Sequence, residues 1–252
     1  MTKTPVSHSV AATVLSEGRH AVLSQPAQAK AAPGVPVVIV MPLTAPCQSR
    51  EFANEARLIS LLNAASHPVG IVSWRHLWER KSKERFSPRV NDLAKLLCDA
   101  IGPGHPVHLA TIGNAALVTL KWLTSLAGED STVAPQVSSL SLIAPELHIF
   151  DRIPRTTLRD APNDCCVIAD GARPWADTCD LANKLPVTPN FALAQDHCNF
   201  LLSDDDRNPD EDILSNAAHF EGDWRLSWAD WLHRVHRRHQ AGDDLPRPTG
   251  LL

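Results

Sequence analysis

The chain has 252 residues, of which 44% are hydrophobic and 21% charged, and its formal net charge is −4. This length suits one α/β domain with a full core, and the charge gives no general attraction to nucleic acid or anionic membranes. The longest apolar runs, such as residues 35–40, fall far short of the ~20 residues of a membrane span, and residues 1–20 lack the apolar core of a signal peptide. We therefore expect a cytoplasmic protein with no membrane span and no nucleic-acid partner.

The N-terminal third predicts an arm, a strand and a helix. Residues 1–34 are rich in Ala, Ser and Gln and end in Ala-Ala-Pro-Gly, which indicates a flexible N-terminal arm. Residues 36–41 are continuous, apolar and β-branched, which is typical of a buried strand of a parallel sheet. Residues 51–65 repeat apolar side chains at helical spacing and predict a helix.

A second strand is predicted over residues 69–74, and an amphipathic helix over residues 90–101, ended by Gly102-Pro103-Gly104. The charged segment 75–89 lies between them. Its arginines and lysines could hold the phosphates of coenzyme A or another anion. A mixed run of both charges is more typical of a solvated face, and we favour that interpretation.

The most informative segment is residues 106–126, an apolar strand that runs through a tight turn into an apolar helix. The turn reads Ala110-Thr111-Ile112-Gly113-Asn114-Ala115-Ala116. In α/β-hydrolases such a turn carries the nucleophile on a strained elbow, within the motif G-x-S-x-G. Neither Ser nor Cys stands in this turn. The segment therefore predicts the scaffold of the elbow without its usual nucleophile.

Three further strands are predicted downstream, over residues 137–144, 165–169 and 190–194. A short helix is expected over residues 177–185. The last helix carries Trp224, Trp228 and Trp231 at i, i+4 and i+7, a stripe that we expect to pack against the sheet. The polar, Pro-rich residues 241–252 predict a flexible tail.

Neither the cysteines nor the C-terminal histidines predict a metal site. The six cysteines show no C-x-x-C and no ligand spacing, which indicates reduced, buried thiols. His233, His236 and His239 recur every three residues, so two could share a helix face and bind a metal. Because no Cys or carboxylate lies in register with them, a basic helix end is the better interpretation. We expect no metal and no cofactor.

Strands that alternate with helices predict an α/β-hydrolase-like fold, with a mainly parallel sheet flanked by helices, over residues 35–240. Chemistry in such sheets occurs at the carboxyl ends of the strands. The turn at Thr111, then Asp170, then His197 follow one another in the order of hydrolase triads. These three residues are the candidate catalytic set.

Two motifs resemble those of the polyhydroxyalkanoate (PHA) synthases. Ser73-Trp74-Arg75 matches the motif that ends the second strand of that family, and residues 222–232 resemble its Trp-rich closing stretch. The resemblance covers roughly residues 35–240. It implies that His197 corresponds to the general base of the family and that Asp170 falls near the triad acid.

The chain also departs from the PHA synthases. Their nucleophile is a cysteine in G-x-C-x-G, and the equivalent position here is Thr111 or Gly113, depending on how the turn is counted. The large cap of the family is reduced to residues 148–164, so we expect little or no cap. Polymer synthesis in the usual sense is therefore not expected.

Each candidate catalytic residue has a functional and a structural interpretation. Thr111 could act as a nucleophile with His197 as base and Asp170 to orient the imidazole, a role that Asp196 or Asp177 could take instead. Alternatively, Thr111 and Asp170 cap the helices that follow them, and local hydrogen bonds hold His197.

The loop after the first buried strand is where hydrolases place an oxyanion-hole amide. Cys47 in this loop is a weaker alternative nucleophile, because nothing marks its thiol as having a depressed pKa. Leu43, Thr44 and Cys47, together with Asn114 of the turn, are the candidate ligand-binding residues.

Three functions remain open from the sequence. The leading hypothesis is a catalytically impaired or repurposed relative of the PHA synthases that binds an acyl, hydroxyacyl or acyl-CoA-like ligand, or a protein partner. The alternative is an active acyltransferase or ester or thioester hydrolase that uses Thr111, His197 and Asp170. A third is a structural subunit that pairs with a larger synthase or with another copy of the chain.

Overall fold

Six parallel strands form the centre of the fold in the computed structural model. They are β3 (Val37–Val40), β4 (Val69–Trp74), β5 (Pro106–Ile112), β6 (Gln136–Ile143), β7 (Cys165–Asp170) and β8 (Asn190–Ala194). The residues described are 12–26, 34–43, 55–75, 87–126, 134–145, 162, 164–170, 190–194, 199–203 and 218–241. In this part of the chain one ten-stranded sheet runs in the order β1-β2-β4-β3-β5-β6-β7-β8-β9-β10.

Apolar, β-branched residues explain why the central strands form. All four residues of β3 are buried, and Ile39 pairs with Ile71 of β4 on one side and with Ala110 of β5 on the other. A strand with apolar side chains on both faces is stable only where helices cover both faces of the sheet.

Antiparallel strands close both edges of the sheet. On one edge, β1 (Thr13–Glu17) and β2 (Ala21–Gln25) form a hairpin, and β2 pairs with β4. On the other edge, β8 is followed by β9 (Asn199–Ser203) and β10 (Ala218–Glu221). The prediction of a flexible arm over residues 1–34 is therefore wrong for this hairpin. Alternate buried residues, Ala21 and Leu23, anchor it in the core.

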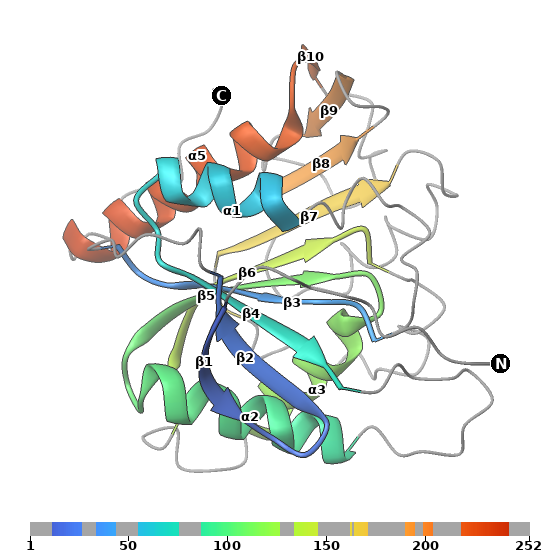
Figure 1. Cartoon of the computed structure of the whole chain (residues 1–252). Helices are drawn as coiled ribbons and strands as arrows, with labels where there is room; N and C mark the ends of the chain where they lie inside the picture. Colours follow the sequence, from blue (N-terminus) through green and yellow to red (C-terminus); the bar gives the residue numbers. More distant parts are fainter. Residues whose placement is uncertain are drawn as a thin grey trace, which may run out of the picture.

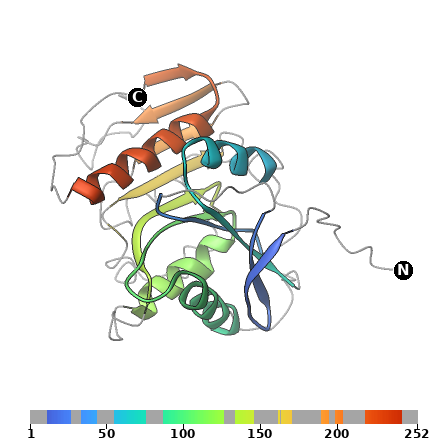
Figure 2. The ribbon, with the colours of Figure 1, turned by 60° about the vertical axis from the view of Figure 1, so that its left-hand side comes forward.

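Two pairs of helices cover the two faces of the sheet (Figures 1 and 2). Helices α2 (Ser87–Ile101) and α3 (Ala115–Leu126) pack together on one face. On the other face lie α1 (Glu55–Ala64) and α5 (Trp224–Ala241), which brings Trp224, Trp228 and Trp231 into the core. The predicted Trp stripe thus packs as expected.

The prediction of a mainly parallel sheet flanked by helices is confirmed. The helix expected over residues 177–185 lies outside the described residues, as do most of the interval 148–164 and the tail beyond residue 241. None of the described helices is long and apolar enough to cross a membrane.

Candidate functional site

The turn between β5 and α3 is built around a glycine. Gly113 has a φ of 61°, and its N–H donates to the carbonyl of Ile143 at 2.9 Å. A positive φ of this size is costly for any residue with a Cβ and easy for glycine. Hydrolases hold their nucleophile on this strained strand-to-helix turn. Since Gly113 is the residue of the turn with the positive φ, it occupies the elbow position. The residue at the tip of the turn therefore has no side chain.

Thr111 lies within β5 rather than in the turn. It pairs with Val40 of β3 and Leu142 of β6, and its exposed fraction is 0%. The alternation of the strand puts its side chain on the same face as Leu109, toward α2 and α3. Its Oγ1 atom has no hydrogen-bond partner. The hydroxyl therefore does not cap α3, so that interpretation of Thr111 was wrong.

Asn114 connects the elbow to the segment that follows β3. Its side-chain Oδ1 accepts the backbone N–H of Leu43 at 2.8 Å, and both residues are buried. In hydrolases an oxyanion hole uses the amide after the nucleophile together with an amide from the loop after this strand. Here a donor of that loop is already bonded to a side chain of the turn. An oxyanion at this position would have to displace the Asn114 carbonyl oxygen.

The structure brings only part of the predicted site together. Asp170 ends β7, which is separated from β5 by β6, and its carboxyl end lies on the same sheet edge as the elbow. Thr44, Cys47 and His197 lie outside the described residues, so the distance from Thr111 to His197 is not defined. The catalytic roles of these residues stay predictions.

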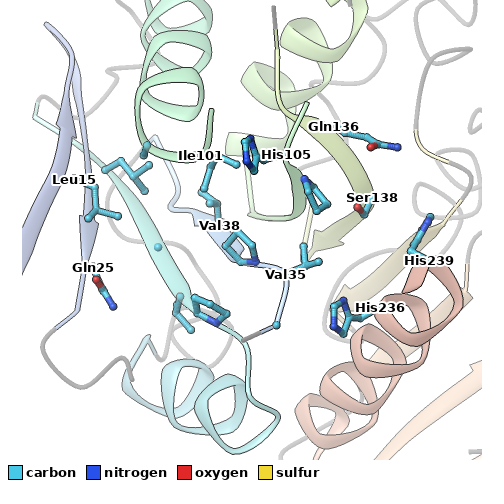
Figure 3. A pocket seen from close by; sticks show the side chains of 18 residues that line it. Leu15, Gln25, Val35, Val38, Ile101, His105, Gln136, Ser138, His236 and His239 are labelled. Atoms are coloured by element: carbon cyan, nitrogen blue, oxygen red, sulfur yellow. The ribbon is translucent and has the colours of Figure 1, made fainter. Parts of the chain in front are cut away.

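A pocket of about 690 Å³ lies at the amino-terminal ends of the parallel strands, at the other end of these strands from the elbow (Figure 3). Apolar side chains of β1, β2, β3 and α2 form much of its wall, among them Leu15, Leu23, Val38 and Ile101. Its polar lining residues are Gln25, His105, Gln136, Ser138, His236 and His239. The sequence did not predict this pocket, because the topology of a parallel sheet points to the carboxyl ends of the strands as the place of chemistry. The histidines near strand and helix ends were the available signal.

Beside the pocket, three imidazole rings from distant parts of the chain meet. The centroids of His67 and His108 are 5.6 Å apart, those of His67 and His236 are 5.8 Å apart, and those of His108 and His236 are 6.4 Å apart. Burial lowers the pKa of all three rings, and repulsion among the histidines lowers it further, to about 3 for His108. These rings are therefore neutral near pH 7. In the part of the chain described, no group of three His, Cys, Asp or Glu side chains could hold a metal ion.

No family model matches the sequence, and no curated protein matches it significantly. Solved structures share its fold. A sugar hydrolase of Lactococcus lactis has a TM-score of 0.57 and 9% identity, over 92% of this chain and 99% of that one. A protein of unknown function from Agrobacterium tumefaciens, given as a candidate α/β hydrolase, has a TM-score of 0.51 and 13% identity, over 94% and 100%. A predicted CIB-like hydrolase of Thermoplasma acidophilum has a TM-score of 0.52 and 7% identity, over 73% and 86%.

These matches show that the chain has the α/β-hydrolase fold. They extend over nearly all of the chain for two of the three structures. At such low identity the likeness concerns the fold and not the reaction.

Proposed function

We propose that this chain is a non-catalytic α/β-hydrolase-fold protein that binds an acyl or hydroxyacyl ligand. The observation that carries the proposal is the β5–α3 turn, where Gly113 forms the elbow and Asn114 holds the amide of Leu43. Acyl transfer needs a nucleophile at the elbow and free donors for the oxyanion. Gly113 offers no nucleophile, and the Leu43 donor is occupied.

The resemblance to the PHA synthases supports the ligand class, which is an acyl or hydroxyacyl group, free or as a coenzyme A thioester. The matching motif has a structural role in this chain. Trp74 Nε1 donates to the carbonyl of Met41 at 2.7 Å, and Arg75 pairs with Glu17 at 2.9 Å. The motif therefore supports a scaffold shared with the PHA synthases, and it gives no support for a shared catalytic reaction.

The pocket at the amino edge of the strands is the binding site that we favour. Its volume of about 690 Å³ falls within the range of small-molecule sites, roughly 300–1,000 Å³. An acyl chain suits the apolar wall around Leu15, Val38 and Ile101. A carboxylate or carbonyl head could accept hydrogen bonds from Ser138, Gln136 or a histidine of the lining.

The catalytic part of the proposal is tested by incubating the full chain with short- and medium-chain acyl thioesters. We expect release of coenzyme A at the rate of the buffer alone. Turnover that is lost in both Thr111→Val and His197→Ala would overturn the proposal. It would favour a hydrolase or acyltransferase that uses Thr111, His197 and Asp170.

The binding part is tested by calorimetry with octanoate and octanoyl-CoA. Leu15 and Val14 are neighbours on β1 and are both exposed, at 44% and 52%, but Leu15 lines the pocket and Val14 does not. We expect Leu15→Glu to weaken binding about tenfold or more, because a carboxylate replaces an apolar contact, whereas Val14→Glu leaves it nearly unchanged. Equal effects of the two variants would overturn the choice of this pocket. Absence of binding, with co-purification of a larger synthase, would favour a subunit role instead.

A further inference from the structure

We infer that His67, His108 and His236 form an acid-released latch, which holds the C-terminal half of α5 on the sheet while the three rings are neutral. His67 lies in the α1–β4 connection, His108 in β5 and His236 in α5. The three rings meet edge to face, with centroids 5.6–6.4 Å apart. The latch acts on α5 itself, whatever ligand the pocket binds.

The hydrogen bonds of the cluster determine where a proton would go. Nδ1 of His67 lies 2.9 Å from the carbonyl oxygen of Val35, which can only accept, so this nitrogen carries the ring proton. Nδ1 of His108 lies 2.8 Å from Ser139 Oγ. Three further ring nitrogens, Nε2 of His67, Nε2 of His108 and Nδ1 of His236, are buried without a hydrogen-bond partner. A proton added to His67 would therefore create a buried charge that no acceptor satisfies.

The charged groups around the cluster are mostly arginines. On α5, Arg234, Arg237 and Arg238 flank His236, together with the titratable side chains His233 and His239, and His105 lines the pocket beside it. The carboxylate on the facing side is Asp164, which already pairs with Arg238 at 2.7 Å and with His239 at 3.2 Å. Asp230 of α5 is exposed. A protonated cluster would thus face further positive charge, with Asp164 already engaged.

The N-terminal half of α5 has independent anchors. Trp224, Trp228 and Trp231 are buried, and Trp228 Nε1 donates to Ser141 Oγ at 2.9 Å. Asp223 pairs with Arg225 at 2.9 Å and with Arg57 of α1 at 2.5 Å. Residues 232–241 are held by the cluster together with the buried side chains of Leu232 and Val235 and the pair of Arg238 with Asp164. Protonation of the cluster would therefore weaken the docking of this half and leave the Trp-anchored half in place. His236 and His239 project from this half to the pocket (Figure 3), so release also removes one wall of the pocket.

The expected size of the response follows from proton linkage. Each histidine that stays neutral while docked and titrates near its ordinary pKa of about 6.5 when released raises the released-to-docked ratio tenfold per pH unit below that value. Three such histidines give up to about a thousandfold per pH unit. The docked helix is favoured above pH 6.5 and is lost as the pH falls.

Hydrogen exchange of the full chain, measured by mass spectrometry at pH 7.0, 6.0 and 5.5 and corrected for the intrinsic exchange rate, tests the latch. We expect the open fraction of residues 232–241 to rise by more than tenfold per pH unit below pH 6.5. Residues 115–126 of α3 serve as the internal reference and should not change. A rise of less than tenfold per pH unit, or an equal rise in α3, would overturn the inference.

A pair of histidine variants makes the test specific. His236→Gln keeps a polar side chain without the titration, and we expect it to reduce the pH response by about tenfold per pH unit. His20→Gln, in the β1–β2 turn, is the matched control and should keep the wild-type response. If His236→Gln already loosens α5 at pH 7.0, the latch is judged from the wild-type chain alone, by how steeply the open fraction of residues 232–241 rises as the pH falls. Protection of residues 232–241 by added Zn²⁺ at pH 7.0, lost in His236→Gln, would identify a metal site and overturn the latch.

Discussion

The side-chain carbonyl of Asn114 accepts the backbone N–H of Leu43 at 2.8 Å, across 71 positions of sequence. This bond joins the turn before α3 to the segment after β3, at the place where a hydrolase would bind an oxyanion. The same turn that lacks a nucleophile thus also fills a donor position of the site. Both features favour a structural use of the elbow, and both can be tested.

Asn114→Ala removes the acceptor and leaves the buried amide of Leu43 unpaired. We expect the free energy of unfolding to fall by about 1–3 kcal/mol, the usual cost of an unsatisfied buried donor. Urea unfolding measures the change. Leu226→Ala is the control, since Leu226 is 53% exposed and its truncation should cost less than about 0.5 kcal/mol. Similar losses in the two variants would contradict the buried role of the bond.

Gly113→Ala tests the conformation of the elbow. With a φ of 61°, we expect alanine to lower the free energy of unfolding by about 1–2 kcal/mol. Gly104→Ala is a matched control for the backbone term, because Gly104 has a φ of 71° and a Cβ there would meet no atom within 4 Å. Gly113→Ala should cost at least as much as Gly104→Ala. A stabilising effect at Gly113 would show that the turn is not constrained as described.

Thr111→Val replaces a buried hydroxyl that has no partner. We expect the free energy of unfolding to rise by about 0.5–2 kcal/mol, because a polar group no longer has to be buried unpaired. The control is Thr124→Val, since Thr124 Oγ1 bonds the carbonyl of Lys121 at 2.8 Å and that of Leu120 at 3.1 Å. That variant should bring no such gain. Destabilisation by Thr111→Val would mean that the hydroxyl has a partner in solution.

Ser141 and Trp228 connect β6 to α5 through a buried hydrogen bond of 2.9 Å. A double-mutant cycle of Ser141→Ala and Trp228→Phe should give a coupling energy of about 0.5–1.5 kcal/mol, the net value of such a bond. Thermal or urea unfolding of the four proteins provides the numbers. If the two single variants have strictly additive effects on the free energy of unfolding, the bond does not stabilise the packing of α5 on the sheet.

His108 makes the stability of the whole protein depend on pH. Burial lowers the pKa of His108 to about 3 in the folded chain. The unfolded chain therefore binds a proton at this residue near pH 6.5, whereas the folded chain does not. The contribution is fully present above pH 6.5 and is lost as the pH falls, by about 2 kcal/mol between pH 6.5 and 5 for this residue alone. Urea unfolding at pH 7, 6 and 5 should show the decline, with a shallower slope for His108→Gln. Parallel slopes for the two proteins would refute the role of His108.

The central fold could be predicted because each buried strand carries its signal in its own residues. The run of apolar, β-branched residues in β3 and the Trp stripe of α5 determine which face each element buries. The β1–β2 hairpin could not be predicted in the same way. Only Ala21 and Leu23 mark its buried face, and its stability comes from pairing with β4, a contact between distant segments.

The site was less predictable than the fold because it, too, depends on contacts between distant segments of the chain. The sequence of the turn allows either Thr111 or Gly113 at the nucleophile position, and the positive φ of Gly113 identifies it as the elbow residue. Nothing near His67 or His108 in the sequence indicates that they meet His236, because the fold alone brings the three rings together. The bond between Asn114 and Leu43 is likewise a product of the tertiary structure.

The β1–β2 hairpin has one further consequence. The edge of β4 would otherwise present a row of unpaired backbone groups beside buried apolar side chains, a surface on which foreign strands can add. Residues 21–24 cover that edge by pairing with residues 71–74. A chain without residues 1–26 would expose this edge of β4, and we expect such a chain to self-associate. The N-terminal hairpin therefore replaces β4 as the outer edge of the described sheet, with β1 as the new edge strand.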